Sequence, residues 1–113
     1  MAVTIWHNAA CSNSRGALQL IRDAGIEPTI VDYVVHPPTA TALRKVLADA
    51  GMSPMELIRS KEAVFEELGL AQASDDARVA AMVAHPQLIN RPVVITPKGT
   101  RLCRPPTRVL DLL

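Results

Sequence analysis

The sequence predicts an α/β fold, in which a four-stranded mixed sheet is flanked by helices. Three observations indicate it: short β-branched runs alternate with helical patterns, the middle of the chain carries helical signals only, and two short strand patterns adjoin near the C-terminus. The 113 residues are 49% hydrophobic and 20% charged, which is the length and composition of one ordered domain. We therefore expect a single domain over residues 1–113, with a helical insertion at about 53–86.

The first third of the chain predicts a strand, a helix and a second strand. Residues 3–6 and 29–34 are β-branched strand candidates. Between them, residues 12–24 carry apolar side chains at helical spacing, and Gly25 can adopt the left-handed conformation with which many helices end. Because about 25 residues and a helix separate the strands, we expect the strands to pair in parallel.

The middle of the chain predicts helices. The first begins at Thr39 and ends at Gly51, and Ser53-Pro54-Met55-Glu56 then has the pattern of a capping box with proline at the first helical position. A further helical segment covers residues 62–68, and Ser74 caps the last helix of this block.

The C-terminal part predicts a hairpin and a final helix. Residues 92–96 and 100–103 are short strand patterns on either side of Pro97-Lys98-Gly99. Pro105 then begins a helix, whose apolar residues are Val109, Leu110, Leu112 and Leu113.

Composition and charge argue against several classes of protein. A net charge of +1 does not suit a protein built mainly to bind nucleic acid. No apolar run approaches the roughly 20 residues of a membrane helix, and the N-terminal residues lack the pattern of a secretion signal. The histidines and the two cysteines show no metal-binding spacing, so we expect no metal. We also expect a cytoplasmic protein and, from the balanced charge, a monomer.

Cys11 is the candidate nucleophile. It follows the first strand, at the point where the first helix begins. Free backbone N–H groups and the helix dipole stabilise an anion there, which favours the thiolate and lowers the pKa of the cysteine. His7 and the hydroxyls of Ser12 and Ser14 can assist through hydrogen bonds. A small buried cysteine is the alternative, and the polar neighbours at this turn favour the reactive interpretation.

Cys103 is not expected to pair with Cys11. The chain has no Cys-x-x-Cys motif, because Ser14 stands three residues after Cys11. Cys103 lies at the end of a predicted strand, where it is expected to be packed. If Cys11 performs redox chemistry, its electrons therefore come from an external thiol.

Arginine is the second chemical signal, with an excess over lysine and a cluster near the C-terminus. Planar guanidinium groups bind tetrahedral oxyanions through paired hydrogen bonds. Arg91 precedes Pro92 at a strand start, and Arg104 follows a strand end, so both can converge on a pocket at the end of the sheet. Pro92 also suits a cis peptide bond. The other interpretation is an ordinary solvated helix surface, which we assign to Arg22, Arg44 and Arg78.

Four segments of the sequence match a known family. They are the loop Ile5-Trp6-His7-Asn8-Ala9-Ala10-Cys11-Ser12-Asn13-Ser14-Arg15, then Leu57-Ile58-Arg59, Leu88-Ile89-Asn90-Arg91-Pro92-Val93-Val94, and Gly99-Thr100-Arg101-Leu102-Cys103-Arg104-Pro105. In order and spacing, they resemble the ArsC family of glutaredoxin-dependent arsenate reductases over essentially the whole chain. The resemblance implies a thioredoxin-like fold, as a single ArsC-type domain with a helical insertion.

The resemblance also implies roles for particular residues. Cys11 corresponds to the catalytic nucleophile, and His7 and Ser14 correspond to residues that favour its thiolate. Pro92 corresponds to a cis-proline near the site. The resemblance assigns Arg59, Arg91 and Arg104 to binding of the oxyanion. We add Ser12 and Asn13, which directly follow Cys11, as further substrate-binding candidates.

The implied reaction is the conversion of arsenate to arsenite, by attack of the Cys11 thiolate on As(V). Glutathione is the co-substrate, glutaredoxin is the partner, and no cofactor is tightly bound. The chain departs from the family at Ala9, where members commonly carry proline two residues before the nucleophile. Since alanine restricts the backbone less than proline, we expect a less constrained loop.

Two alternatives of related fold remain open at this point. Spx-type regulators bind RNA polymerase and do not reduce arsenate, but they often carry a Cys-x-x-Cys switch that this chain lacks. The other alternative is an ArsC-like thiol reductase with a different substrate. The three arginines that match the family favour the arsenate reductase.

Overall fold

Four short strands form one mixed sheet, in the order β2-β1-β3-β4. The central strand β1 (Thr4–His7) pairs in parallel with β2 (Thr29–Asp32) and antiparallel with β3 (Val93–Thr96). Strand β3 pairs antiparallel with β4 (Gly99–Leu102), which confirms the predicted hairpin. The mixed sheet and the parallel pairing of the first two strands are confirmed as well.

The computed structural model describes residues 1–113, which divide into two units. Unit 1 consists of Met1–His36 and Arg91–Leu113, and it contains the sheet together with α1 (Ser12–Asp23) and η3 (Pro106–Leu112). Unit 2 is Pro37–Asn90, and it contains the remaining helices. Whether these units form a single domain, as the sequence analysis expects, stays a prediction.

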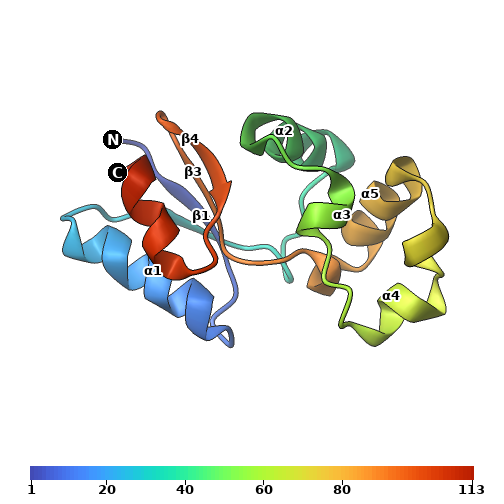
Figure 1. Cartoon of the computed structure of the whole chain (residues 1–113). Coiled ribbons are helices and arrows are strands. Elements are labelled where there is room, and N and C mark those ends of the chain that lie inside the picture. The colour runs from blue at the N-terminus through green and yellow to red at the C-terminus, as the bar shows by residue number, and fades with distance from the viewer. The chain divides into compact units, whose positions relative to one another are not determined.

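One face of the sheet in unit 1 is covered by α1 and η3, which lie side by side in Figure 1 (blue and red). The two helices approach closely at Gly16, where a Cβ atom would lie 3.0 Å from Pro106 Cγ. Gly25, at φ 80°, ends α1 as predicted. The buried residues of this core are Val3, Ile5, Ala17, Leu18, Ile21, Val94, Cys103, Val109 and Leu112.

The final helix differs from the expected α-helix. It is a 3₁₀ helix that begins at Pro106 and has Pro105 as its N-cap. With three residues per turn, Val109 and Leu112 lie on the same side and are both buried, whereas Leu110 lies on the outer side and is 52% exposed.

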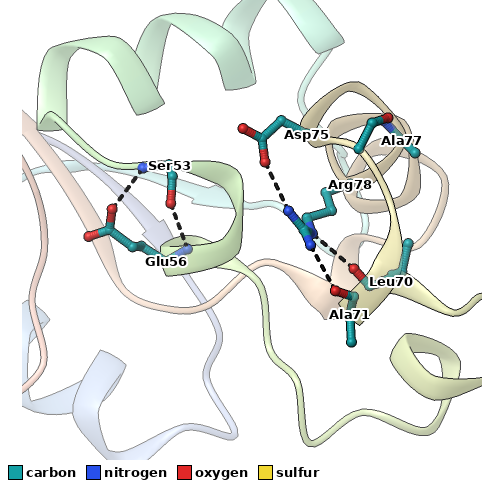
Figure 2. Close-up of polar contacts among 8 residues, drawn as sticks. Ser53, Glu56, Leu70, Ala71, Asp75, Ala77 and Arg78 are labelled. Carbon is teal, nitrogen blue, oxygen red and sulfur yellow. Dashed lines mark hydrogen bonds and ion pairs between the residues drawn. The ribbon is translucent and has the colours of Figure 1, made fainter.

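The helices of unit 2 begin at the residues that the sequence marks as caps. Thr39 Oγ1 accepts a hydrogen bond from Ala42 N (3.1 Å), and Ser74 Oγ accepts one from Ala77 N (3.1 Å). Ser53 and Glu56 form the predicted capping box (Figure 2). The elements are α2 (Ala40–Ala50), α3 (Pro54–Leu57), α4 (Ala63–Glu67), η1 (Leu70–Gln72), α5 (Asp75–Ala84) and η2 (Pro86–Leu88).

Arg78 on α5 is not a solvated surface residue, and that expectation was wrong. Its guanidinium donates hydrogen bonds to Leu70 O (2.9 Å) and Ala71 O (3.2 Å) and pairs with Asp75 (3.0 Å), as Figure 2 shows. Both carbonyl groups belong to the short η1, where Leu70 O also accepts a hydrogen bond from Ala73 N (3.4 Å), and Arg78 provides them with further donors. Arg22 and Arg44 are exposed, as predicted. None of the helices combines the length and apolar character needed to cross a membrane.

Replacing Ile21 tests how far this core positions α1. Ile21 is completely buried, so Ile21→Ala removes buried methyl groups and leaves a cavity. We expect the free energy of unfolding to fall by about 2–5 kcal/mol, measured by urea denaturation. The control is Gln19→Ala on the exposed side of α1, which should change the stability by less than about 0.5 kcal/mol. Equal effects of the two substitutions would contradict this account of the core.

Candidate active site

Cys11 lies between strand β1 and helix α1, where it is the N-cap of the helix. A turn precedes it, in which Cys11 N donates a hydrogen bond to Asn8 O (3.0 Å) and Ala10 N donates one to Asn8 Oδ1 (3.0 Å). The Cys11 side chain makes no capping bond and is half-buried. The loop therefore presents the sulfur at the N-terminal end of a helix of 12 residues, where the helix dipole favours negative charge.

The surroundings of Cys11 lower the pKa of its thiol below the usual value. Burial acts the other way and raises it, but hydrogen bonds from the backbone N–H of Ser14, the Arg91 side chain and the backbone N–H of Asn13 outweigh burial. The positive charge of Arg91 adds to their effect. The thiolate is thus stabilised, as the position at the start of the helix predicts.

Arg91 and Arg104 lie together because of the hairpin. Val93 pairs with Leu102, and the hydrogen bond from Cys103 N to Pro92 O (2.9 Å) continues the pairing by one step. Arg91 directly precedes Pro92 and Arg104 directly follows Cys103, so the two arginines come next to each other. Since Trp6 near the end of β1 pairs with Val93 at the start of β3, the loop that carries Cys11 leaves the sheet at the same end of the strands as these two arginines.

Arg104 contacts the sulfur directly. Its Nη1 donates a hydrogen bond to Cys11 Sγ (3.7 Å) and another to Arg91 O (2.9 Å). The Arg91–Pro92 peptide bond is cis, as is Arg104–Pro105, and the second of these was not anticipated from the sequence. The structure thus brings Arg91 and Arg104, the two arginines of unit 1 predicted to bind substrate, to the candidate nucleophile.

His7 and Ser14 form a hydrogen-bonded pair beside the loop. Ser14 is completely buried, and its Oγ lies 2.6 Å from His7 Nδ1 and accepts a hydrogen bond from Asn8 N (3.0 Å). Burial chiefly lowers the pKa of His7, and Asp32 partly opposes this shift. His7 is therefore neutral at pH 7. It is the backbone N–H of Ser14 that reaches the sulfur, while the hydroxyl binds His7 and the loop.

The other predicted substrate-binding residues lie in different surroundings. Ser12 is exposed at the first position of α1. The side-chain oxygen of Asn13, in the amide orientation that satisfies both groups, accepts hydrogen bonds from Arg104 Nη1 and Nη2 (3.2 Å each). Both residues therefore remain candidates whose roles in substrate binding are predictions.

Arg59 belongs to unit 2. It lies beyond the end of α3, and its backbone N–H donates a hydrogen bond to Leu88 O (2.7 Å). Its guanidinium donates to Glu62 Oε1 (3.3 Å) and Asn90 Oδ1 (3.4 Å), and the side chain is 21% exposed. Its role in the site stays a prediction that rests on the resemblance.

The loop is well held although it lacks the family proline. Ala9 is the second residue of the turn that Asn8 and Cys11 close, and its carbonyl accepts a hydrogen bond from Arg15 Nη1 (2.8 Å). Sequence reasoning missed these contributions of Asn8 and Arg15. The tendency of Asn side chains to bind the backbone two residues further on is the signal that identifies Asn8.

Cys103 is packed in the core, as predicted. It is completely buried, and its sulfur donates a hydrogen bond to Arg101 O (3.6 Å). Burial raises the pKa of its thiol to about 11.

Nowhere do three or more His, Cys, Asp or Glu side chains gather in a way that could hold a metal ion.

Comparison with known proteins identifies the family, because the family model of the ArsC family matches residues 6–112. The chain belongs to the ArsC family. It is 51% identical over 115 residues to an arsenate reductase of Rhizobium meliloti (strain 1021), an alignment that covers 100% of this chain and 82% of the relative. It is 50% identical over 113 residues to an arsenate reductase of Escherichia coli (strain K12), and this alignment covers 98% of this chain and 80% of the relative.

A solved structure supports the fold of this ArsC-family chain. An arsenate reductase from Vibrio cholerae superimposes with a TM-score of 0.96 at 40% identity, and the match covers 100% of this chain and 98% of that one. The fold is thus thioredoxin-like, as the resemblance implied.

The two cysteines of this ArsC-family chain should differ sharply in reactivity. We expect iodoacetamide at pH 7 to modify Cys11 in the folded protein. When the rate of modification is measured against pH, its midpoint should lie below the usual thiol pKa of about 8.5. Cys103, with a pKa of about 11, has almost no thiolate at this pH and should react only after unfolding in urea. The Cys11→Ser variant isolates Cys103 as the control. A midpoint for Cys11 at or above the usual value would contradict the stabilisation described above.

Proline should be tolerated at position 9 and not at position 10. Ala9 occupies the second position of a turn, where proline is favoured, and the loop's hydrogen bonds come from the N–H groups of Asn8, Ala10 and Cys11. We expect Ala9→Pro to raise the free energy of unfolding by about 0.4–1 kcal/mol in urea denaturation. Ala10→Pro is the matched control, and it should destabilise because it removes the donor to Asn8 Oδ1. Equal destabilisation by both substitutions would show that Ala9 does not occupy the second position of this turn.

Proposed function

We propose that this chain is an arsenate reductase, which converts arsenate to arsenite with Cys11 as its nucleophile. The observation that carries the proposal is the stabilised Cys11 sulfur at the start of α1, in hydrogen-bond contact with Arg91 and Arg104. Membership of the ArsC family supports the same reaction.

The site suits a tetrahedral oxyanion. The N-terminal end of α1 offers backbone N–H groups, and Arg91 and Arg104 offer guanidinium groups with positive charge. Without substrate, these donors stabilise the thiolate. When arsenic comes within bonding distance of the sulfur, the same donors reach the arsenate oxygens and stabilise the charge that the transition state develops.

The first chemical step forms a bond between sulfur and arsenic. The Cys11 thiolate attacks As(V), and one arsenate oxygen leaves as water after it takes up protons. Arsenic stays in the +5 state in the resulting adduct. His7 and Ser14 favour the thiolate in this proposal, because their hydrogen bonds to each other and to Asn8 hold the loop that carries Cys11.

External thiols complete the reduction. A glutathione thiolate attacks the Cys11 sulfur of the adduct, and the sulfur–arsenic bond breaks with its electron pair staying on arsenic. Arsenite, As(III), leaves, and a disulfide between Cys11 and glutathione remains. A glutaredoxin thiol then attacks this disulfide and releases the Cys11 thiolate. Cys103 does not serve as the resolving thiol, because it is buried and its pKa is raised to about 11.

The remaining assignments extend this proposal. Arg59 joins the substrate-binding set and Pro92 borders the site on the strength of the resemblance, and Ser12 and Asn13 complete the set as neighbours of Cys11. The reaction needs no tightly bound cofactor. We place it in the cytoplasm, where the reducing pool keeps thiols available, and assign it to a monomer.

Phosphate has the same shape and charge as arsenate, so the arginines alone do not distinguish the two anions. The distinction comes from the redox step, because thiols reduce As(V) and do not reduce P(V). Phosphate therefore competes for the site without being converted.

Arsenate-dependent oxidation of NADPH, in the presence of glutathione, glutaredoxin and glutathione reductase, tests the function. We expect Cys11→Ser to reduce this oxidation to the background rate, because no thiolate remains at the site. Cys103→Ser should retain most of the activity and is the matched control. Phosphate in place of arsenate should give no oxidation. A wild-type rate that is independent of arsenate would refute the proposal, and activity that is lost with Cys103 alone would show that Cys11 is the wrong sulfur.

A further inference from the structure

We infer that Asn13 is a positioning residue, whose side-chain amide holds the Arg104 guanidinium against the Cys11 sulfur. This inference rests on the proposed function, since it assigns a part to Asn13 in the same site. It replaces direct contact with the substrate as the main role of the Asn13 side chain.

Arg104 has three acceptors around its guanidinium. They are Cys11 Sγ (3.7 Å), Arg91 O (2.9 Å) and Asn13 Oδ1, which accepts from both terminal nitrogens (3.2 Å each). The acceptor from Arg91 is a backbone carbonyl, and the sulfur is the reacting atom. Asn13 therefore supplies the fixed side-chain acceptor in this set.

Contact with both terminal nitrogens fixes the orientation of the guanidinium plane. An arginine side chain has considerable rotamer entropy, and a pair of hydrogen bonds to one oxygen restricts it before substrate arrives. Asn13 itself is held at the second position of α1 and is half-buried. Arg104 is thereby prepared for the oxyanion without having to be ordered by it.

A neutral acceptor suits this task better than a carboxylate. The amide oxygen of Asn13 accepts hydrogen bonds and leaves the positive charge of Arg104 undiminished. A carboxylate at this position would neutralise Arg104 and place a negative charge beside both the thiolate and the incoming oxyanion. The backbone N–H of Asn13 also donates to the sulfur, and this contribution persists when only the side chain is changed.

The position separates the effect on the site from the effect on the fold. Alanine is a better helix former than asparagine, so Asn13→Ala should not destabilise α1. Aspartate in the first turn of a helix interacts favourably with the helix dipole, so Asn13→Asp should leave the fold equally or more stable. A weaker stabilisation of the Cys11 thiolate in these variants would then not be explained by a lower free energy of unfolding.

The experiment compares wild type, Asn13→Ala and Asn13→Asp. The pH dependence of Cys11 alkylation should give a midpoint that rises in this order, because the first substitution releases Arg104 and the second neutralises it. Inhibition of alkylation by arsenate should become about tenfold weaker in Asn13→Ala, as expected for the loss of a hydrogen bond to a charged group. The urea midpoint should stay constant or increase. Unchanged alkylation midpoints in both variants would overturn the inference.

A double-mutant cycle with Arg104→Ala gives the decisive control. If Asn13 acts through Arg104, Asn13→Ala should shift the Cys11 midpoint in the wild-type background and not in the Arg104→Ala background. An equal shift in both backgrounds would overturn the inference. Gln19→Glu, about 9 Å further along α1, controls for added charge and should leave the midpoint unchanged. The alkylation readout needs no turnover, so it tests Asn13 even if the wild type fails to reduce arsenate.

Discussion

The site in unit 1 depends on stabilising a single negative charge on the sulfur of Cys11. Burial of that sulfur raises its pKa, so the thiolate exists at neutral pH only where hydrogen bonds and positive charge outweigh the loss of water. The backbone N–H groups at the start of α1 supply the first contribution, and Arg91 supplies the second. The same donors suit a tetrahedral oxyanion, which links the state of the cysteine to the substrate it is proposed to attack.

The packing of unit 1 keeps these donors at the sulfur. The core between the sheet, α1 and η3 fixes the helix, and the close contact of Gly16 with Pro106 brings the C-terminal segment against it. The β3–β4 hairpin sets Arg91 and Arg104 at one end of paired strands. The polar parts of the site thus depend on an aliphatic core that takes no part in the chemistry, and on an asparagine that orients one arginine.

Much of this arrangement could be predicted from sequence. Short-range signals, such as the caps at Thr39, Ser53 and Ser74, act through hydrogen bonds between residues close in the chain, so they were predictable. The 3₁₀ form of η3 was not predicted, and neither were the hydrogen bonds of the half-buried Arg78 side chain, which join α5 to the carbonyl groups of η1. The contacts of Arg104 with Cys11 and Asn13 join residues that are far apart in the chain, so no local pattern indicates them.

The sequence by itself determined the order of the elements, the parallel pairing of β1 and β2, and Cys11 as the candidate nucleophile, because periodicity, caps and the strand-to-helix turn are local properties. It also determined the family, through four matching segments. Tertiary structure alone decided which donors reach the sulfur: the backbone N–H and not the hydroxyl of Ser14, and Arg104 held by Asn13. The physical reason is that hydrogen bonds depend on distances and directions of a few tenths of an ångström, which only the packed chain fixes.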